Sequence, residues 1–99
     1  MIQVPPIRLV PQPIDERAAA ELTVGFRWAA PETGSRHRLG GEPTFQSMPA
    51  PTCSSCSSPM TFYGQLDSIS DEISLADAGV VAVWICFDCF EAHARIEST

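Results

Sequence analysis

The residues best suited to chemistry in this chain are its four cysteines, which form two Cys-x-x-Cys pairs: Cys53 with Cys56, and Cys86 with Cys89. Such a turn presents two sulfurs on one side of a tight knuckle, and zinc prefers four ligands in a tetrahedron, with sulfur at about 2.3 Å. Two knuckles therefore supply a complete ligand shell. The segment between them, residues 57–85, exceeds the usual spacing of about 15–20 residues, and the extra length accommodates two strands and an acidic loop.

A closed shell of four thiolates leaves no open position for water or substrate, so the pattern predicts one structural Zn²⁺ ion and no metal catalysis. Two other uses of the cysteines compete with this interpretation. Disulfides are disfavoured because the first residues lack the charged and apolar regions of a signal peptide, which also predicts a cytoplasmic protein. A thioredoxin-like redox motif needs one Cys-x-x-Cys at the start of a helix, whereas both pairs here border predicted strands. Trp84 is expected to shield the metal from water, and backbone N–H groups of both knuckles to donate to the thiolates.

Length and composition predict a single small domain made of two parts. Residues 1–51 are rich in proline and glycine, whereas residues 52–99 hold all four cysteines and the densest apolar runs. A hydrophobic content of 44% excludes a disordered chain, at least for the second part. The hydrophobic core of a 99-residue chain is marginal, and metal binding contributes on the order of 10 kcal/mol of folding free energy in such sites.

The elements that must position the knuckles are clearest in the second part. Residues 60–66 alternate, with Met60, Phe62, Gly64 and Leu66 on one face, which predicts a half-buried strand. Residues 67–79 are polar and acidic and predict a long connection. Residues 80–85 are continuously apolar and predict a central strand buried on both faces. Residues 90–97 alternate as a strand does, although their Ala/Glu/Arg composition also allows a helix.

The first part is punctuated by proline. A short edge strand is expected at residues 7–10, next to flanking prolines. Residues 15–22 combine an acidic first turn with good helix formers and predict a short helix that Gly25 ends, although residues 22–28 also alternate as a strand would. Residues 31–44 are expected to be a loop. The predicted fold is a small β-rich domain (α+β at most), with a zinc-ribbon-like antiparallel sheet and a Pro-rich N-terminal segment.

The charge of the chain limits the class of its partners. Twelve acidic residues against six basic ones, all arginine, give a net charge of −6, which disfavours nucleic acid and anionic membranes. The acidic connection is a candidate surface for a basic protein partner, which it would attract by electrostatic steering; the alternative is a solvated loop. Its four carboxylates are those of Asp67, Asp71, Glu72 and Asp77.

At this point a family resemblance is visible. The run GGEPTFQ at residues 40–46 precedes the first knuckle, MTFYGQL at 60–66 follows it, and DAGVVAVWIC at 77–86 leads into the second. Together they resemble the C-terminal half of the YwqG-like bacterial family of unknown function, over residues 38–97. The resemblance implies a sheet-rich binding domain. Two features depart from the family: its members are about twice as long, and Ser57 stands where a glycine commonly follows the first knuckle.

These observations favour a non-enzymatic, zinc-stabilised protein-binding module, in its sharper form an inhibitor of the immunity or antitoxin type that docks a basic partner. The alternative is a zinc-ribbon nucleic-acid-binding or transcription accessory protein, in which Tyr63, Phe87 and Phe90 stack on bases. No nucleophile or phosphate-binding motif stands out. An enzyme would have to use His37, His93 or Asp88.

Overall fold

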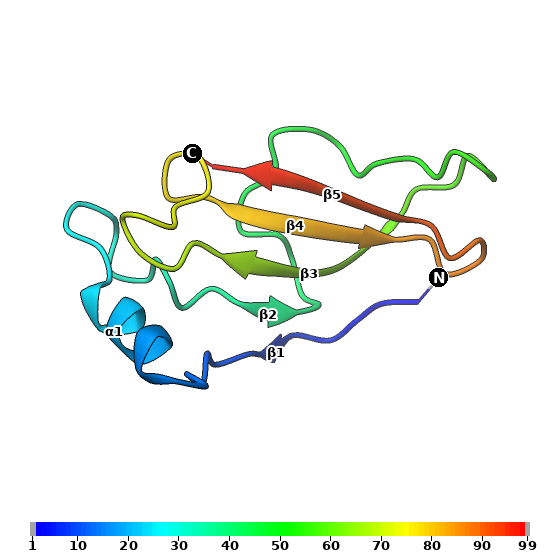
Figure 1. Ribbon diagram of the computed structural model, residues 1–99. Coiled ribbons are helices and arrows are strands. Elements are labelled where there is room, and N and C mark those ends of the chain that lie inside the picture. Colours follow the sequence, from blue (N-terminus) through cyan, green and yellow to red (C-terminus); the bar gives the residue numbers. More distant parts are fainter. Residues whose placement is uncertain (1, 99) are drawn as a thin grey trace.

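The computed structural model describes residues 2–98, which form a five-stranded antiparallel sheet and one short helix (Figure 1). The sheet order is the chain order, and each strand pairs with the next. The predicted β-rich domain with an antiparallel sheet is confirmed. In chain order the elements are β1 (Ile7–Arg8), α1 (Glu16–Val24), β2 (Arg38–Leu39), β3 (Thr61–Asp67), β4 (Val80–Ile85) and β5 (Ala92–Glu97).

Strand β4 is central, as predicted, because it pairs with both β3 and β5. Its two faces differ, however. Val80, Ala82 and Trp84 are buried, whereas the alternate residues from Val81 to Ile85 are only half-buried. The expectation of burial on both faces is therefore wrong, because the sheet has one covered face and one face that is partly open to solvent. Strand β5 confirms the strand predicted within residues 90–97, and the alternative helix there is wrong.

A β-bulge divides β3 into two halves with opposite alternation. Phe62 pairs with Trp84 and Gly64 pairs with Val83, which leaves Tyr63 as an extra residue. Phe62 and Gln65 consequently lie on the covered face, while Leu66 is 51% exposed on the other. The prediction that Phe62 and Leu66 share a face is wrong, because strict alternation over the whole strand assumes that no residue is inserted.

The first part of the chain supplies the edge of the sheet and the helix. Strand β1 is an edge strand, as expected, but it is shorter than the predicted segment. Helix α1 begins at the N-cap Asp15, whose Oδ1 accepts from the Ala18 N–H at 2.9 Å, and ends at Gly25. The predicted helix is thus confirmed, and the alternative strand at residues 22–28 is wrong. Within residues 31–44, expected to be a loop, the structure adds the two-residue strand β2.

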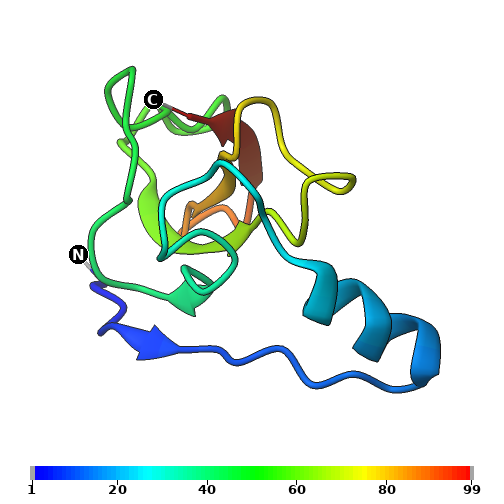
Figure 2. The same cartoon turned by 90° about the vertical axis from the view of Figure 1, so that its left-hand side faces the viewer.

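Helix α1 contributes no buried residue and lies apart from the sheet (Figure 2). It spans nine residues, and no helix within residues 2–98 is long and apolar enough to cross a membrane. The buried apolar cluster lies instead on the covered face of the sheet. Its members come from the strands and both knuckles: Cys53, Met60, Phe62, Ala82, Trp84 and Cys86.

The turn after β2 requires glycine at position 40. Gly40 has a φ of +63°, and a Cβ there would lie against the carbonyl oxygens of Val4 and Pro5. Its N–H donates to Tyr63 O at 2.7 Å, which ties this turn to β3, and the Gly41 N–H donates to Val4 O at 2.9 Å, which ties the N-terminal segment to the same turn. We expect Gly40→Ala to lower the free energy of unfolding by about 2–3 kcal/mol, measured by urea denaturation. Gly25→Ala, also at positive φ but with only an ordinary contact to Thr23 O at 3.9 Å, should cost less; an equal cost for both variants would contradict the predicted backbone clash.

Candidate metal centre

The structure brings the four predicted ligands together at one end of the sheet. The sulfurs of Cys53, Cys56, Cys86 and Cys89 lie within 4.8 Å of one another, and none forms a disulfide. The Cys56 and Cys86 sulfurs are 3.8 Å apart. Two sulfurs at about 2.3 Å from one tetrahedral ion are about 3.8 Å apart. The four thiols are therefore positioned to bind a metal ion with little rearrangement.

The two knuckles have the same backbone hydrogen bonds, which explains why they present their sulfurs alike. In the first knuckle, Ser57 N donates to Cys53 O at 2.8 Å, and Cys53 N donates to Ser58 O at 2.8 Å. The equivalent bonds of the second knuckle are Phe90 N to Cys86 O at 2.7 Å and Cys86 N to Glu91 O at 2.9 Å. Each knuckle is thus a closed turn that holds its first cysteine at the end of a strand ladder.

Both knuckles also turn through a residue in the left-handed region. Ser57 has a φ of +63° and Phe90 a φ of +58°. Glycine adopts this conformation without steric cost, which gives a physical reason for a glycine directly after a knuckle of this kind. Ser57 and Phe90 keep the conformation because the two backbone hydrogen bonds of each turn require it.

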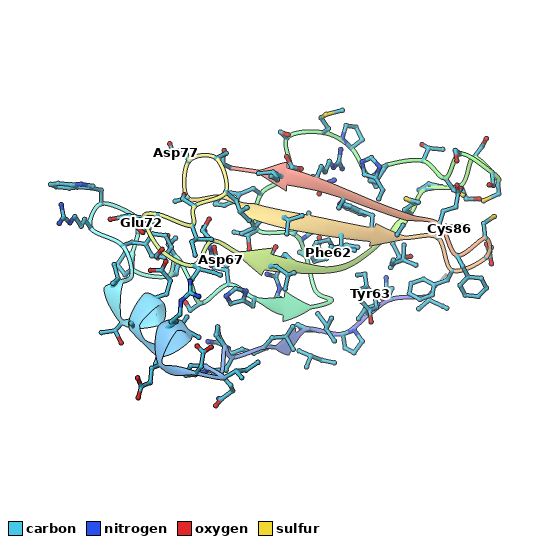
Figure 3. The ribbon with its side chains drawn as sticks, viewed as in Figure 1. Phe62, Tyr63, Asp67, Glu72, Asp77 and Cys86 are labelled. Atoms are coloured by element: carbon cyan, nitrogen blue, oxygen red, sulfur yellow. The ribbon has the colours of Figure 1, made fainter. Side chains whose placement is uncertain are left out.

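The cluster is buried on its inner side and open on its outer side. Cys53 and Cys86 are 1% and 4% exposed and pack in the apolar cluster with Trp84, whereas Cys56 and Cys89 are exposed. In Figure 3, Cys86 lies just after the C-terminal end of β4, and Asp67 lies at the other end of the sheet. Trp84 packs with Cys53 and Cys86 and so covers the inner side of the metal site, in agreement with the predicted shielding from water. On the outer side Cys56 and Cys89 are exposed to solvent.

Glu91 is a residue of the site that sequence reasoning missed. Its carboxylate accepts from the Cys53 thiol at 2.9 Å, from Ser54 Oγ at 2.8 Å and from Ser55 N at 3.1 Å. The hydrogen bond from Cys53 lowers the pKa of Glu91 to about 2, and the carboxylate raises the pKa of the Cys53 thiol. Through Ser54 and Ser55, Glu91 joins the two knuckles beside the metal site; its bond from Cys53 requires the protonated thiol, which metal binding removes. Its only sequence signal is its position two residues after Cys89.

The thiols differ in how readily they lose a proton. Hydrogen bonds from the Ser58 side chain and backbone lower the pKa of Cys56 to about 7. The hydrogen bond to Cys56 raises the pKa of the exposed Cys89 to about 12. Since a metal binds the thiolate form, loading the site releases protons.

The predicted acidic docking surface is smaller than expected. Asp67 is buried, with its side chain 0% exposed, and faces Arg36, so its assignment to a partner surface is wrong. Asp71 is exposed, and its Oδ2 accepts from Arg27 N at 3.0 Å. Glu72 and Asp77 are exposed on the same connection (Figure 3). Three of the four predicted carboxylates therefore remain at the surface.

Asp67 instead organises the end of the sheet opposite to the metal centre. Its Oδ1 accepts from Arg36 Nη2 at 2.7 Å, and its Oδ2 accepts from Arg36 Nε at 2.8 Å and from Gly34 N at 2.7 Å. Burial raises the pKa of Asp67, but the hydrogen bonds and charge of Arg36 outweigh it and hold that pKa below its usual value. The same bonds raise the pKa of Arg36.

The three residues that an enzyme would have to use lie on separate elements. His37 accepts from Asp67 N through Nδ1 at 2.9 Å, at the end of the sheet opposite to the knuckles. His93 is exposed on β5, and Asp88 is exposed in the second knuckle. The structure does not bring these side chains to one site.

No protein-family model, curated protein or solved structure matches this chain. The resemblance to the YwqG-like family stays a prediction that rests on the three sequence runs and the two knuckles.

Proposed function

We propose that the chain is a zinc-stabilised binding module that docks a basic protein partner on the open face of its sheet. The metal has a structural role in this proposal. Four soft thiolates in a tetrahedral arrangement select zinc or iron, and zinc is the usual ion of isolated sites built from two Cys-x-x-Cys knuckles. A closed shell of four thiolates holds the ion without leaving a position for substrate.

The observation that carries the binding role is an apolar row across three strands. Leu66, Val81 and Ile96 lie directly opposite one another in β3, β4 and β5, and Leu66 and Ile96 are 51% and 54% exposed. A shallow apolar groove of about 170 Å³, which Leu66 and Val83 also line, continues this surface toward β2. We call this surface the open face and define it as Tyr63, Leu66, Val81, Val83 and Ile96. Contiguous exposed apolar surface of this kind marks interaction sites.

The charge next to the open face indicates the chemistry of its partner. The acidic connection leaves the sheet after Asp67, one residue beyond Leu66, and returns at Val80, one residue before Val81. It carries the exposed carboxylates of Asp71, Glu72 and Asp77. A partner with an apolar patch bordered by Lys and Arg complements this arrangement, and the charges would increase its association rate. In the sharper form of the proposal the partner is a basic toxin, such as a nuclease, that the chain inhibits.

A nucleic-acid ligand is the alternative, and one feature favours it. Tyr63 and Phe87 lie with ring centroids 6.4 Å apart, and Phe90 is 80% exposed, so aromatic rings for base stacking are present. The net charge of −6 opposes this reading.

The test is affinity capture from nuclease-treated lysate of the source cells, with the retained chains identified by mass spectrometry. We expect the wild-type protein to retain a stoichiometric basic protein, and the double variant Leu66→Arg/Ile96→Arg to lose it. Val24→Arg, an equally polar change at an exposed site on α1, is the matched control and should retain the partner. Equal capture by the open-face variant, an acidic partner, or a parallel capture without nuclease treatment that retains nucleic acid alone would refute the proposal.

A further inference from the structure

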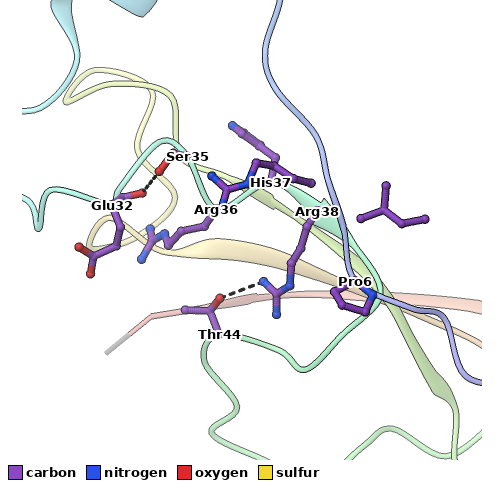
Figure 4. Close-up of a pocket in the computed structure, with 9 residues that line it drawn as sticks. Pro6, Glu32, Ser35, Arg36, His37, Arg38 and Thr44 are labelled. Carbon is purple, nitrogen blue, oxygen red and sulfur yellow. Dashed lines mark hydrogen bonds between the residues drawn. The ribbon is translucent and has the colours of Figure 1, made fainter.

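A second candidate site lies on the covered side of the sheet, far from the metal centre. A groove of about 510 Å³ is formed by β1, β2 and the turn before β2, and its lining includes Arg8, Arg36, Arg38 and Thr44 (Figure 4). Half of the six basic residues of an acidic chain therefore meet at one groove. Asp67 pairs with Arg36 and Glu32 also lines the groove, so Arg8 and Arg38 carry the excess positive charge there.

Two of these arginines face each other without a carboxylate partner. Arg8 and Arg38 are directly opposite in the register of β1 and β2, an arrangement of like charges that destabilises a sheet. Within residues 2–98, the ion pairs involve only Arg36 with Asp67 and Arg95 with Glu97. An anion bound between Arg8 and Arg38 would convert this repulsion into attraction.

Two of the three guanidinium groups at the groove, those of Arg36 and Arg38, are held in place before any ligand binds. Arg38 Cζ lies 5.7 Å from the centre of the Phe62 ring, and its Nη1 donates to Thr44 Oγ1 at 3.2 Å. Arg36 Cζ lies 5.1 Å from the centre of the Phe45 ring, and its Nε and Nη2 are bonded to Asp67. Its Nη1 has no hydrogen-bond partner in the described part of the chain. Fixed guanidinium groups lose little side-chain freedom on binding.

The Thr44 hydroxyl adds a neutral donor at the same place. Its oxygen accepts from Arg38 Nη1 and from Gln65 Nε2, the latter at 2.7 Å. With two donors already directed at its oxygen, the hydroxyl has its hydrogen free to donate, and Thr44 is exposed at the groove. A ligand that accepts from the arginines and from Thr44 must carry several acceptor oxygens.

We propose that this groove binds the phosphate group of a small phosphate monoester. Guanidinium groups bind the oxygens of a phosphate in pairs, and its remaining oxygen accepts from Thr44. The groove is larger than a phosphate ion, and Glu32 also lines it, where its carboxylate accepts from hydroxyl groups on the rest of the ligand. This site lies on the covered face, where Arg38 packs over Phe62, whereas the proposed protein-docking role rests on Leu66 and Ile96 on the open face. Arg38 also lines the small groove beside Leu66.

The test is an NMR titration of ¹⁵N-labelled protein with glycerol 3-phosphate and with inorganic phosphate, at constant ionic strength set with chloride. We expect saturable shifts at Thr44 and at the Arg38 side chain, with tighter binding of the monoester. Arg8→Gln and Arg38→Gln should each weaken binding about tenfold or more. Arg17→Gln, which removes the same charge from the exposed surface of α1, should leave it unchanged.

Several outcomes would overturn the proposal. They are the absence of saturable shifts with both probes, an equal loss of binding in Arg17→Gln, and equal affinity for the monoester and inorganic phosphate. Since Arg38 also packs on Phe62, its variant is compared with wild type by thermal unfolding. Arg8 is exposed, so Arg8→Gln decides the question even where Arg38→Gln is destabilised.

Discussion

Replacement of Cys86 by serine is expected to unfold much of the second half of the chain, with the same result for Cys53→Ser. Both thiols belong to the buried apolar cluster that contains Trp84 and Phe62. A structural zinc ion contributes on the order of 10 kcal/mol to folding in sites of this type, whereas the net stability of a small domain is about 5–15 kcal/mol. Loss of the ion therefore removes most of the free energy of unfolding.

Far-UV circular dichroism, together with native mass spectrometry to count bound zinc, measures this effect. The wild-type protein should carry one zinc ion and lose its strand signal when a strong chelator removes it. Ser57→Gly is the matched control in the first knuckle, because it removes a side chain from a position with a φ of +63° and leaves the ligands intact; it should stay folded and bind zinc. A Cys86→Ser spectrum identical to that of the wild type would end the claim of a structural metal.

The parts of the structure that the sequence predicts are those with local signals. The knuckles, β4 and β5 follow from residue spacing and alternation, and α1 follows from the Asp15 cap and Gly25. Strand β2 escapes prediction because two residues carry no periodicity; its partners Ile7 and Gln65 are distant in the sequence. The bulge at Tyr63 escapes for a related reason, since an inserted residue is defined only by the register with β4.

The candidate sites show the same division between local and long-range information. The spacing of the cysteines is a local signal, and the structure places all four together. Glu91 and Asp67 are ordinary carboxylates in the sequence, and their roles depend on partners far along the chain, Cys53 and Arg36. From composition alone Asp67 belongs to an acidic loop. Its ion pair with Arg36 places it in the interior instead.

The ion pair of Asp67 with Arg36 is the second feature whose removal should have a large effect. We expect Asp67→Asn to lower the free energy of unfolding by about 3–5 kcal/mol at neutral pH, because it leaves a buried guanidinium without its counter-charge. The Arg36 side chain is 10% exposed and donates three hydrogen bonds, two of them to Asp67 at 2.7 and 2.8 Å. Asp71→Asn is the matched control on the same connection; its carboxylate is exposed, and the change should cost less than about 1 kcal/mol.

The pH dependence distinguishes loss of this charge from a general disturbance of the loop. The pKa of Asp67 is lower in the folded protein than in the unfolded chain, so the unfolded state binds the proton more readily. The stabilisation is then complete above the unfolded pKa of about 4 and is lost as the pH falls through the folded value. Urea denaturation from pH 7 to pH 3 should show the stabilities of wild type and Asp67→Asn converging in acid. A constant difference between wild type and Asp67→Asn across this range would mean that the carboxylate acts through packing alone, with no contribution from its charge.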